Sequence, residues 1–146
     1  MKSVANILKS KEDTAVYSIA PTASVLDALK LMADKNIGAL LVMEGAAIVG
    51  IVTERDYARK VALMGRTSAQ TPVREVMTSA VMYVRPEQTS EQCMALMTEN
   101  RLRHLPVLND GKLLGVISIG DLVKDIISEQ KFIIEQFERY VTGQRG

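Results

Sequence analysis

The 146-residue chain has few of the side chains on which metal and thiol chemistry depend. It contains one cysteine, Cys93, one histidine, His104, and no tryptophan. A single cysteine excludes an intramolecular disulfide and a cysteine-based metal cluster. A single histidine excludes a zinc site with two histidine ligands, so Cys93 with His104 is the one conceivable thiol catalyst. We therefore expect no bound metal.

The chain also lacks an excess of one charge and lacks long apolar runs. Its 18 basic and 17 acidic side chains give a formal charge of +1, whereas proteins that grip phosphate backbones usually have a basic excess. No window approaches the roughly 18 apolar residues of a membrane span, and the first residues do not resemble a signal peptide. These absences predict a cytoplasmic protein that binds neither nucleic acid nor membrane.

What the chain does contain is an internal repeat. The sequence GIVTERD, Gly50–Asp56, returns sixty-five positions later as GVISIGD, Gly115–Asp121. The same offset places Pro21 on Pro86, and a fixed offset of this kind indicates two copies of one structural unit. We expect bounds of 1–65 for the first domain, 66–71 for a linker, and 72–146 for the second domain with an extended C-terminal helix.

Each copy has the pattern of a small α/β unit with the order strand, helix, strand, strand, helix, preceded by a short amphipathic helix. The strands are expected at Val16–Ile19, Ala39–Met43 and Ala47–Val52 in the first copy, and at Val81–Val84, His104–Leu108 and Lys112–Ile117 in the second. Half a chain makes only a marginal core. We therefore expect the halves to bury their apolar faces against each other as a pseudo-twofold pair.

The repeated corner between strand and helix has two interpretations. Thr53 with Asp56, and Ser118 with Asp121, fit a hydroxyl N-cap followed three residues later by an acid, close to a capping box. The same geometry suits a ligand, because a helix N-terminus attracts phosphate and an aspartate beside it can accept hydrogen bonds from both hydroxyls of a ribose. The repetition favours ligand binding, since two such corners would create two similar clefts.

With NIGALLV, Asn36–Val42, and RLRHLPV, Arg101–Val107, these corners resemble a tandem pair of CBS domains, the module named after cystathionine β-synthase. The resemblance covers the whole chain apart from its last helix. It implies a disc-like, non-catalytic regulatory module that binds AMP, ADP, ATP, NAD or S-adenosylmethionine in two clefts between the repeats. We expect an adenine nucleotide, either AMP, ADP, ATP or NAD, and keep an S-adenosylmethionine sensor as an alternative.

The resemblance also implies which residues line the two clefts. Asp56 and Asp121 would hold the ribose hydroxyls, with Thr53 and Ser118 at the ribose or phosphate. The full set of expected ligand-binding residues is Tyr17, Gly38, Ala39, Thr53, Arg55, Asp56, Met82, Arg103, His104, Ser118, Gly120 and Asp121.

The two clefts are expected to differ. Arg103 and His104 would face phosphates, whereas the equivalent residues of the first copy, Gly38 and Ala39, are uncharged. Arg55 in the first corner has Gly120 as its counterpart, while Tyr17 and Met82 would line the base pockets.

The C-terminal run DLVKDIISEQKFIIEQFERYV carries a long apolar stripe, made of Val123, Ile126, Ile127, Gln130, Ile133, Ile134, Phe137 and Val141. It fits packing on the other repeat, or pairing across a homodimer, which we favour. A separate target protein is a further expected partner. The remaining alternatives are a scaffold whose corners are only helix caps, and an enzyme using Cys93, which an apolar helical face disfavours.

Overall fold

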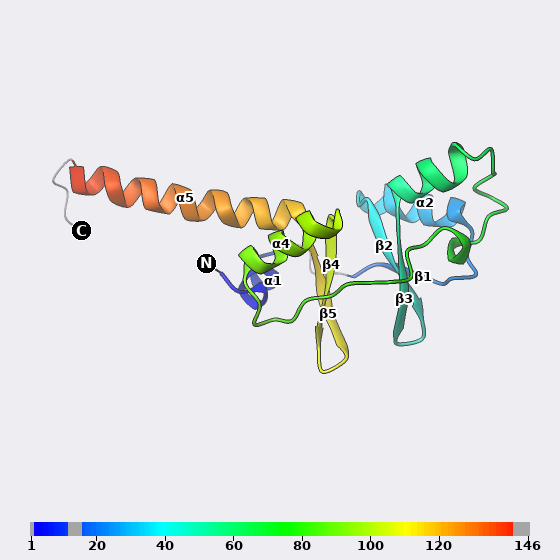
Figure 1. Ribbon diagram of the computed structural model, residues 1–146, viewed down its shortest axis with the longest axis horizontal. Helices are drawn as coiled ribbons and strands as arrows, with labels where there is room; N and C mark the ends of the chain where they lie inside the picture. The colour runs from blue at the N-terminus through cyan, green and yellow to red at the C-terminus, as the bar shows by residue number, and fades with distance from the viewer. Residues whose placement is uncertain (1, 12–15, 142–146) are drawn as a thin grey trace. The chain divides into compact units, whose positions relative to one another are not determined.

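The computed structural model describes residues 2–11 and 16–141 (Figure 1). The chain forms two compact units. One unit joins the described residues up to Lys11 with those from Met82 onward, and the other is Val16–Val81. Each unit has its own buried apolar core and contains one copy of the repeated corner.

The Val16–Val81 unit is built on a three-stranded sheet with the order β1-β2-β3, where β1 is Ser18–Ile19, β2 is Ala39–Glu44 and β3 is Ala47–Thr53. β1 pairs parallel to β2, and β2 and β3 form a hairpin. The helical segments are α2, Val25–Lys35; α3, Glu54–Tyr57; a π turn η1, Ala58–Ala62; and a 3-10 turn η2, Val73–Glu75. Helix α2 begins at the N-cap Ser24 and ends at Asn36, whose positive φ of 55° closes it.

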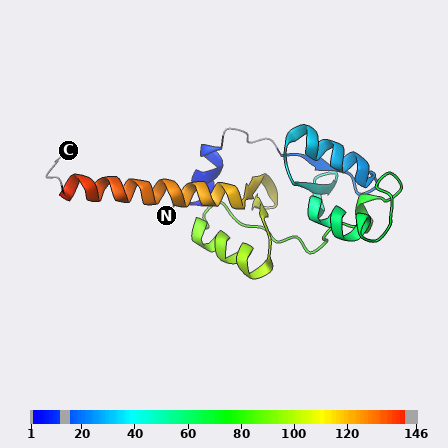
Figure 2. The same cartoon turned by 90° about the horizontal axis from the view of Figure 1, so that it is seen from above.

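The other unit repeats this plan around the hairpin of β4, His104–Asn109, and β5, Lys112–Ser118. Its helices are α1, Val4–Ser10; α4, Ser90–Asn100; and α5, Ile119–Val141. Helix α4 starts with a capping box between Thr89 and Gln92 and ends at Arg101 with φ 54°. Figure 2 shows α1 and α4 on opposite sides of the first half of α5, and both helices contact α5.

The segment that leads into each repeat packs on the other repeat. In one unit, Ala5 N donates to Pro86 O, and a Cβ on Gly115 would lie 2.9 Å from Leu8 Cδ2. In the other, Arg74 N donates to Pro21 O, and a Cβ on Gly50 would lie 2.6 Å from Met77 Sδ. Gly50 and Gly115 are therefore required, because a side chain at either position would collide with the leading segment packed on it.

This exchange explains why the compact units differ from the bounds read from the sequence. The bounds 1–65, 66–71 and 72–146 follow the duplication and remain our proposal for the two copies. Packing instead assigns α1 to the second copy and η2 to the first.

The α/β class, the four hairpin strands and the long last helix are confirmed. The first strand of each copy is shorter than expected: β1 has two residues, and the stretch predicted at Val81–Val84 makes only a bridge between Val84 and Val107. The helix expected around Val73–Met77 is only the short turn η2. Within residues 2–11 and 16–141, no helix has the length and apolar content that crossing a membrane requires.

Candidate functional site

The first corner lies where β3 runs into α3. Asp56 N donates to Thr53 Oγ1 over 3.1 Å, and Thr53 N donates back to Asp56 Oδ2 over 3.0 Å, which completes a capping box. Lys60 Nζ lies 3.1 Å from the other oxygen, Oδ1, and also donates to Val76 O over 2.8 Å. The Asp56 carboxylate is therefore held by its own helix turn and by a lysine four residues later.

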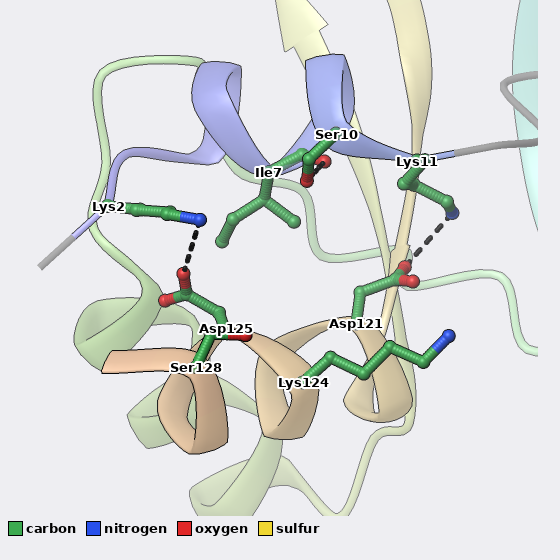
Figure 3. A pocket seen from close by; sticks show the side chains of 8 residues that line it. All are labelled: Lys2, Ile7, Ser10, Lys11, Asp121, Lys124, Asp125 and Ser128. Atoms are coloured by element: carbon green, nitrogen blue, oxygen red, sulfur yellow. Dashed lines mark hydrogen bonds and ion pairs between the residues drawn. The ribbon is translucent and has the colours of Figure 1, made fainter. Parts of the chain in front are cut away.

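The second corner has the same hydrogen bonds at the start of α5. Ser118 N donates to Asp121 Oδ2 over 2.9 Å, and Asp121 N donates to Ser118 Oγ over 3.2 Å. Here the ion pair comes from a distant part of the sequence: Lys11 Nζ, just after α1, lies 3.0 Å from Asp121 Oδ2 (Figure 3). The same ammonium donates to Val116 O over 2.8 Å.

The two corners thus hold equivalent aspartates with lysines from different places. The position of Lys60 is taken in the second copy by Asp125, which has the opposite charge. An i,i+4 lysine is therefore missing at the second corner, and Lys11 supplies the cation instead. Neither lysine was predicted to contact an aspartate; the i,i+4 spacing of Asp56 and Lys60 is a local signal for such a contact, whereas no local pattern connects Lys11 with Asp121.

Asp121 is poised to stay ionised. Burial alone would raise its pKa, but the hydrogen bond from Ser118 N, the hydrogen bond and charge of Lys11, and the Ser118 hydroxyl outweigh burial and lower the pKa below its ordinary value. A carboxylate can accept about four hydrogen bonds. Asp121 therefore presents a negatively charged acceptor at the corner.

The starts of β2 and β4 lie beside the two aspartates. Ala39 pairs with Thr53, and His104 pairs with Ser118. The carbonyl before each strand accepts a hydrogen bond from the first helical residue: Ile119 N donates to Arg103 O over 2.8 Å, and Glu54 N donates in the same way to Gly38 O. The strand start and the capped aspartate therefore meet at one end of each hairpin, as expected.

His104 is half-buried at this end. Burial lowers its pKa, the Asp121 charge opposes that effect, and the Lys11 and Arg103 charges add to it. The pKa of His104 is below its ordinary value, so the imidazole is neutral near pH 7. With Arg103, Lys11 and Asp121 counted, this corner carries a net positive charge.

The remaining expected residues occupy equivalent places in the two units. Arg55 and Gly120 are exposed in the first turn of α3 and α5. Tyr17 O accepts a hydrogen bond from Leu41 N beside β2, and Met82 packs on the edge of the other core. Within each unit the expected residues lie at one end of the sheet. Lys60 lies at that end in the Val16–Val81 unit, and Lys11 lies there in the other unit.

A pocket of about 490 Å³ opens beside the second corner, between α1 and the first turns of α5 (Figure 3). Lys11, Asp121 and Lys124 line the part near the corner. Deeper along α5, both carboxylate oxygens of Asp125 are buried and have no hydrogen-bond partner among the described residues. Lys2 Nζ lies 3.8 Å from one of them, at ion-pair distance only.

The chemistry available at these corners is recognition. A negative acceptor, helix-terminal N–H groups and neighbouring cations suit a ribose and a phosphate. Cys93 is fully buried, and burial raises its pKa, so a reactive thiolate is disfavoured. The described residues include no group of three or more His, Cys, Asp or Glu side chains placed to hold a metal ion.

The family model of the CBS domain matches the chain twice, over residues 8–63 and 73–128. The chain belongs to the CBS-domain family. The mitochondrial CBS domain-containing protein CBSX3 of Arabidopsis thaliana is 38% identical over 97% of this chain and 72% of its own length. The structure of a putative signal-transduction protein with CBS domains from Burkholderia ambifaria MC40-6 is 59% identical, with a TM-score of 0.86, over 88% of this chain and 96% of that one.

A more distant solved structure shares the fold. The CBS domain pair of protein MJ0100 is 21% identical, with a TM-score of 0.75, and covers 88% of this chain and 98% of that one. That protein was crystallised in complex with 5-methylthioadenosine and S-adenosyl-L-methionine. CBS pairs are regulatory modules that bind adenosine-containing ligands, and the resemblance inferred from the two corners is confirmed.

Proposed function

We propose that this protein is a non-catalytic sensor of adenine nucleotides, with AMP, ADP, ATP or NAD as its ligand. The observation that carries the proposal is the duplicated corner, in which an aspartate lies next to a helix N-terminus and a lysine in both copies. Capping one helix needs no such repetition. The distant MJ0100 pair, with its two adenosine compounds, supports the ligand class.

Asp56 and Asp121 accept hydrogen bonds from ribose hydroxyls in this proposal. Each carboxylate is already oriented by a backbone N–H, at 3.0 Å from Thr53 and 2.9 Å from Ser118. A preoriented carboxylate loses little side-chain freedom when it binds a ligand. Thr53 and Ser118 lie close enough to contribute their hydroxyls to the ribose or phosphate.

The two sites differ in their phosphate side. Near Asp121 lie Arg103, His104 and Lys124 of the second copy, together with Lys11, which the first copy contributes. In the first copy, Gly38 lies against Glu54, whose Oε1 would be 3.3 Å from a Cβ at that glycine, and the cations are Arg55 and Lys60. We propose that the second site binds the more highly phosphorylated ligand.

Thermal unfolding of protein freed of bound small molecules tests the function. AMP, ADP, ATP, NAD and S-adenosylmethionine are added separately, and a ligand at about 100 times its dissociation constant stabilises by about 2.7 kcal/mol. No shift with any of them would refute the sensor and favour a scaffold. A shift with S-adenosylmethionine alone would assign the other ligand class.

Single substitutions then locate the sites by titration calorimetry. Asp56→Asn and Asp121→Asn remove the charge but keep an oxygen acceptor, and each is expected to abolish binding at its own corner. Asp27→Asn is the matched control, because Asp27 N also donates to an N-cap serine, Ser24, but lies exposed in α2. Loss of folding rather than binding would show that the aspartates act only as caps.

The proposal includes a homodimer, a separate target protein and a cytoplasmic location, as expected from the sequence. The name of the Arabidopsis relative places that protein in mitochondria. Fractionation of cells that express the native protein distinguishes the two locations.

A further inference from the structure

The C-terminal half of α5 has no cover within the described chain. Every residue from Gln130 to Val141 is exposed, and Phe132, Ile133, Ile134 and Phe137 are 61%, 59%, 56% and 66% exposed. Figures 1 and 2 show this half of the helix continuing beyond α1 and α4. Isolated helices of this length are marginal in water, and exposed apolar surface of this extent marks an interaction site.

Six side chains of α5 follow a heptad pattern, whereas the exposed Phe132 lies outside it. Along α5, successive spacings of four and three residues connect Val123, Ile127, Gln130, Ile134, Phe137 and Val141. These are the a and d positions of a coiled coil, and only Gln130 among them is polar. The regularity of the spacing indicates a second helix as the occupant of this face.

We propose that α5 pairs with α5 of a second copy of this chain as an antiparallel coiled coil. In the register that places every a position opposite a d position, Val123 meets Val141 of the second copy, Ile127 meets its Phe137, and Gln130 meets its Ile134. In this register, each of the six positions of one helix has a partner among the six positions of the second helix. This proposal rests on the homodimer proposed above and is independent of nucleotide binding.

The residues beside the seam select the antiparallel direction. In that arrangement one flank is entirely apolar, with Ile126 beside Tyr140 of the second copy and the two Ile133 side chains facing each other. On the opposite flank Lys124 meets Glu138 of the second copy, so opposite charges approach at both ends of the seam. The two Lys131 side chains face each other at the twofold axis, and each lies four residues before Glu135 of its own helix, a spacing that lets the pair interact.

A parallel pair would mix these flanks. Ile126 would then face Lys131 of the second copy, and Ile133 would face Glu138, so each apolar side chain would lie beside a charge. The two Gln130 side chains would also meet in one layer. The charge distribution therefore fits the antiparallel pair better.

The oligomeric state of the full-length chain tests the pairing. Ile134→Lys places a charge in the central layer at a side chain that is already exposed, and it is expected to raise the dimer dissociation constant roughly a hundredfold or more. Gln136→Lys adds the same charge on the outer face of α5 and is expected to leave the dimer unchanged. Sedimentation equilibrium measures both variants. A monomeric wild-type chain, or equal behaviour of the two variants, overturns the proposal.

Disulfide mapping tests the direction. Because Cys93 is the only cysteine, a Cys93→Ala background allows single cysteines to be placed on α5. Mixed Val123→Cys and Val141→Cys chains are expected to crosslink with each other, and Val123→Cys alone is expected not to crosslink with itself. Self-crosslinking of Val123→Cys would overturn the antiparallel register even if the dimer is present. The homodimer and its register can therefore fail separately, and neither result depends on nucleotide.

Discussion

Removing Lys11 is expected to destabilise the unit that contains the second corner. Its ammonium makes two contacts, at 3.0 Å with Asp121 Oδ2 and at 2.8 Å with Val116 O. The side chains of Lys11 and Asp121 are only 24% and 17% exposed. Water therefore cannot fully replace these contacts when the ammonium is removed. Lys11→Met keeps most of the apolar stem and removes the charge, which isolates the role of the ammonium.

The expected loss is about 2 kcal/mol, toward the lower end of the values for hydrogen bonds to charged groups because both partners retain some contact with water. For a chain of this size that loss lowers Tm by roughly 4–8 °C. Urea unfolding followed by circular dichroism measures it. Lys9→Met is the matched control: Lys9 is an exposed lysine of the last turn of α1, and its loss is expected to be within about 0.5 kcal/mol of zero.

The pH dependence of this loss identifies its cause. The pKa of Asp121 is lowered in the folded protein. At a pH above 3.8, the pKa of the unfolded chain, the ion pair therefore contributes its full stability, and this stability is lost as the pH falls through the pKa of the folded protein. The difference between wild type and Lys11→Met is therefore expected to be full at neutral pH and to shrink below pH 3.8. A difference that matches Lys9→Met, or that does not change with pH, would refute the reasoning.

A second substitution offers a rescue. Asp125→Lys creates at the second corner the i,i+4 spacing that Asp56 and Lys60 have at the first. In a Lys11→Met background it is expected to restore part of the lost stability. Gln136→Lys in the same background adds the same charge far along α5 from Asp121 and is the control that is expected not to rescue.

Three further predictions concern single positions. Gly50→Ala is expected to lower the unfolding free energy by about 1–3 kcal/mol, because its Cβ would lie 2.6 Å from Met77 Sδ. Gly120→Ala is the control and is expected not to lower it, because its Cβ would make only ordinary contacts. Equal urea midpoints for the two variants would contradict the prediction. Asp125→Leu is expected to raise Tm, because both buried carboxylate oxygens lack hydrogen bonds; a lower Tm would mean that the ion pair with Lys2 is net favourable. Because burial keeps the folded pKa of His104 below 6.5, wild type is expected to lose stability as the pH falls through 6.5, and His104→Gln to lose less; parallel Tm profiles would count against it.

Much of the fold followed from local patterns. The four hairpin strands were predicted to within one residue at their ends, because apolar residues bounded by turn residues such as Asp110-Gly111 indicate a hairpin directly. The first strands were predicted too long, since β1 has two residues and its counterpart is only the bridge at Val84. The length of a strand that pairs with only one parallel neighbour depends on its tertiary contacts, and the local sequence does not indicate these contacts.

The candidate site divides in the same way. Both capping boxes could be read from spacing, because the contacts join residues three positions apart. The ion pair of Lys11 with Asp121 could not, because it joins residues far apart in sequence through the packing of α1 on β5. The exchange of leading segments between the copies was missed for the same reason, although Gly50 and Gly115 marked the places where the segments make their close approach.

The different origins of the two lysines connect each corner to a leading segment in a different way. At the first corner, a ribose that displaced Lys60 from Asp56 would break the bond of Lys60 to Val76 O, at the end of the leading segment that contains η2. At the second, displacement of Lys11 would also break its bond to Val116 and release the end of α1 from β5. Both corners therefore connect a ligand to a leading segment, but only at the second corner does the lysine itself come from that segment, directly after α1. Faster amide exchange in α1 on nucleotide binding, absent in Asp121→Asn, is the expected result, and unchanged exchange in α1 would show that Lys11 does not transmit binding.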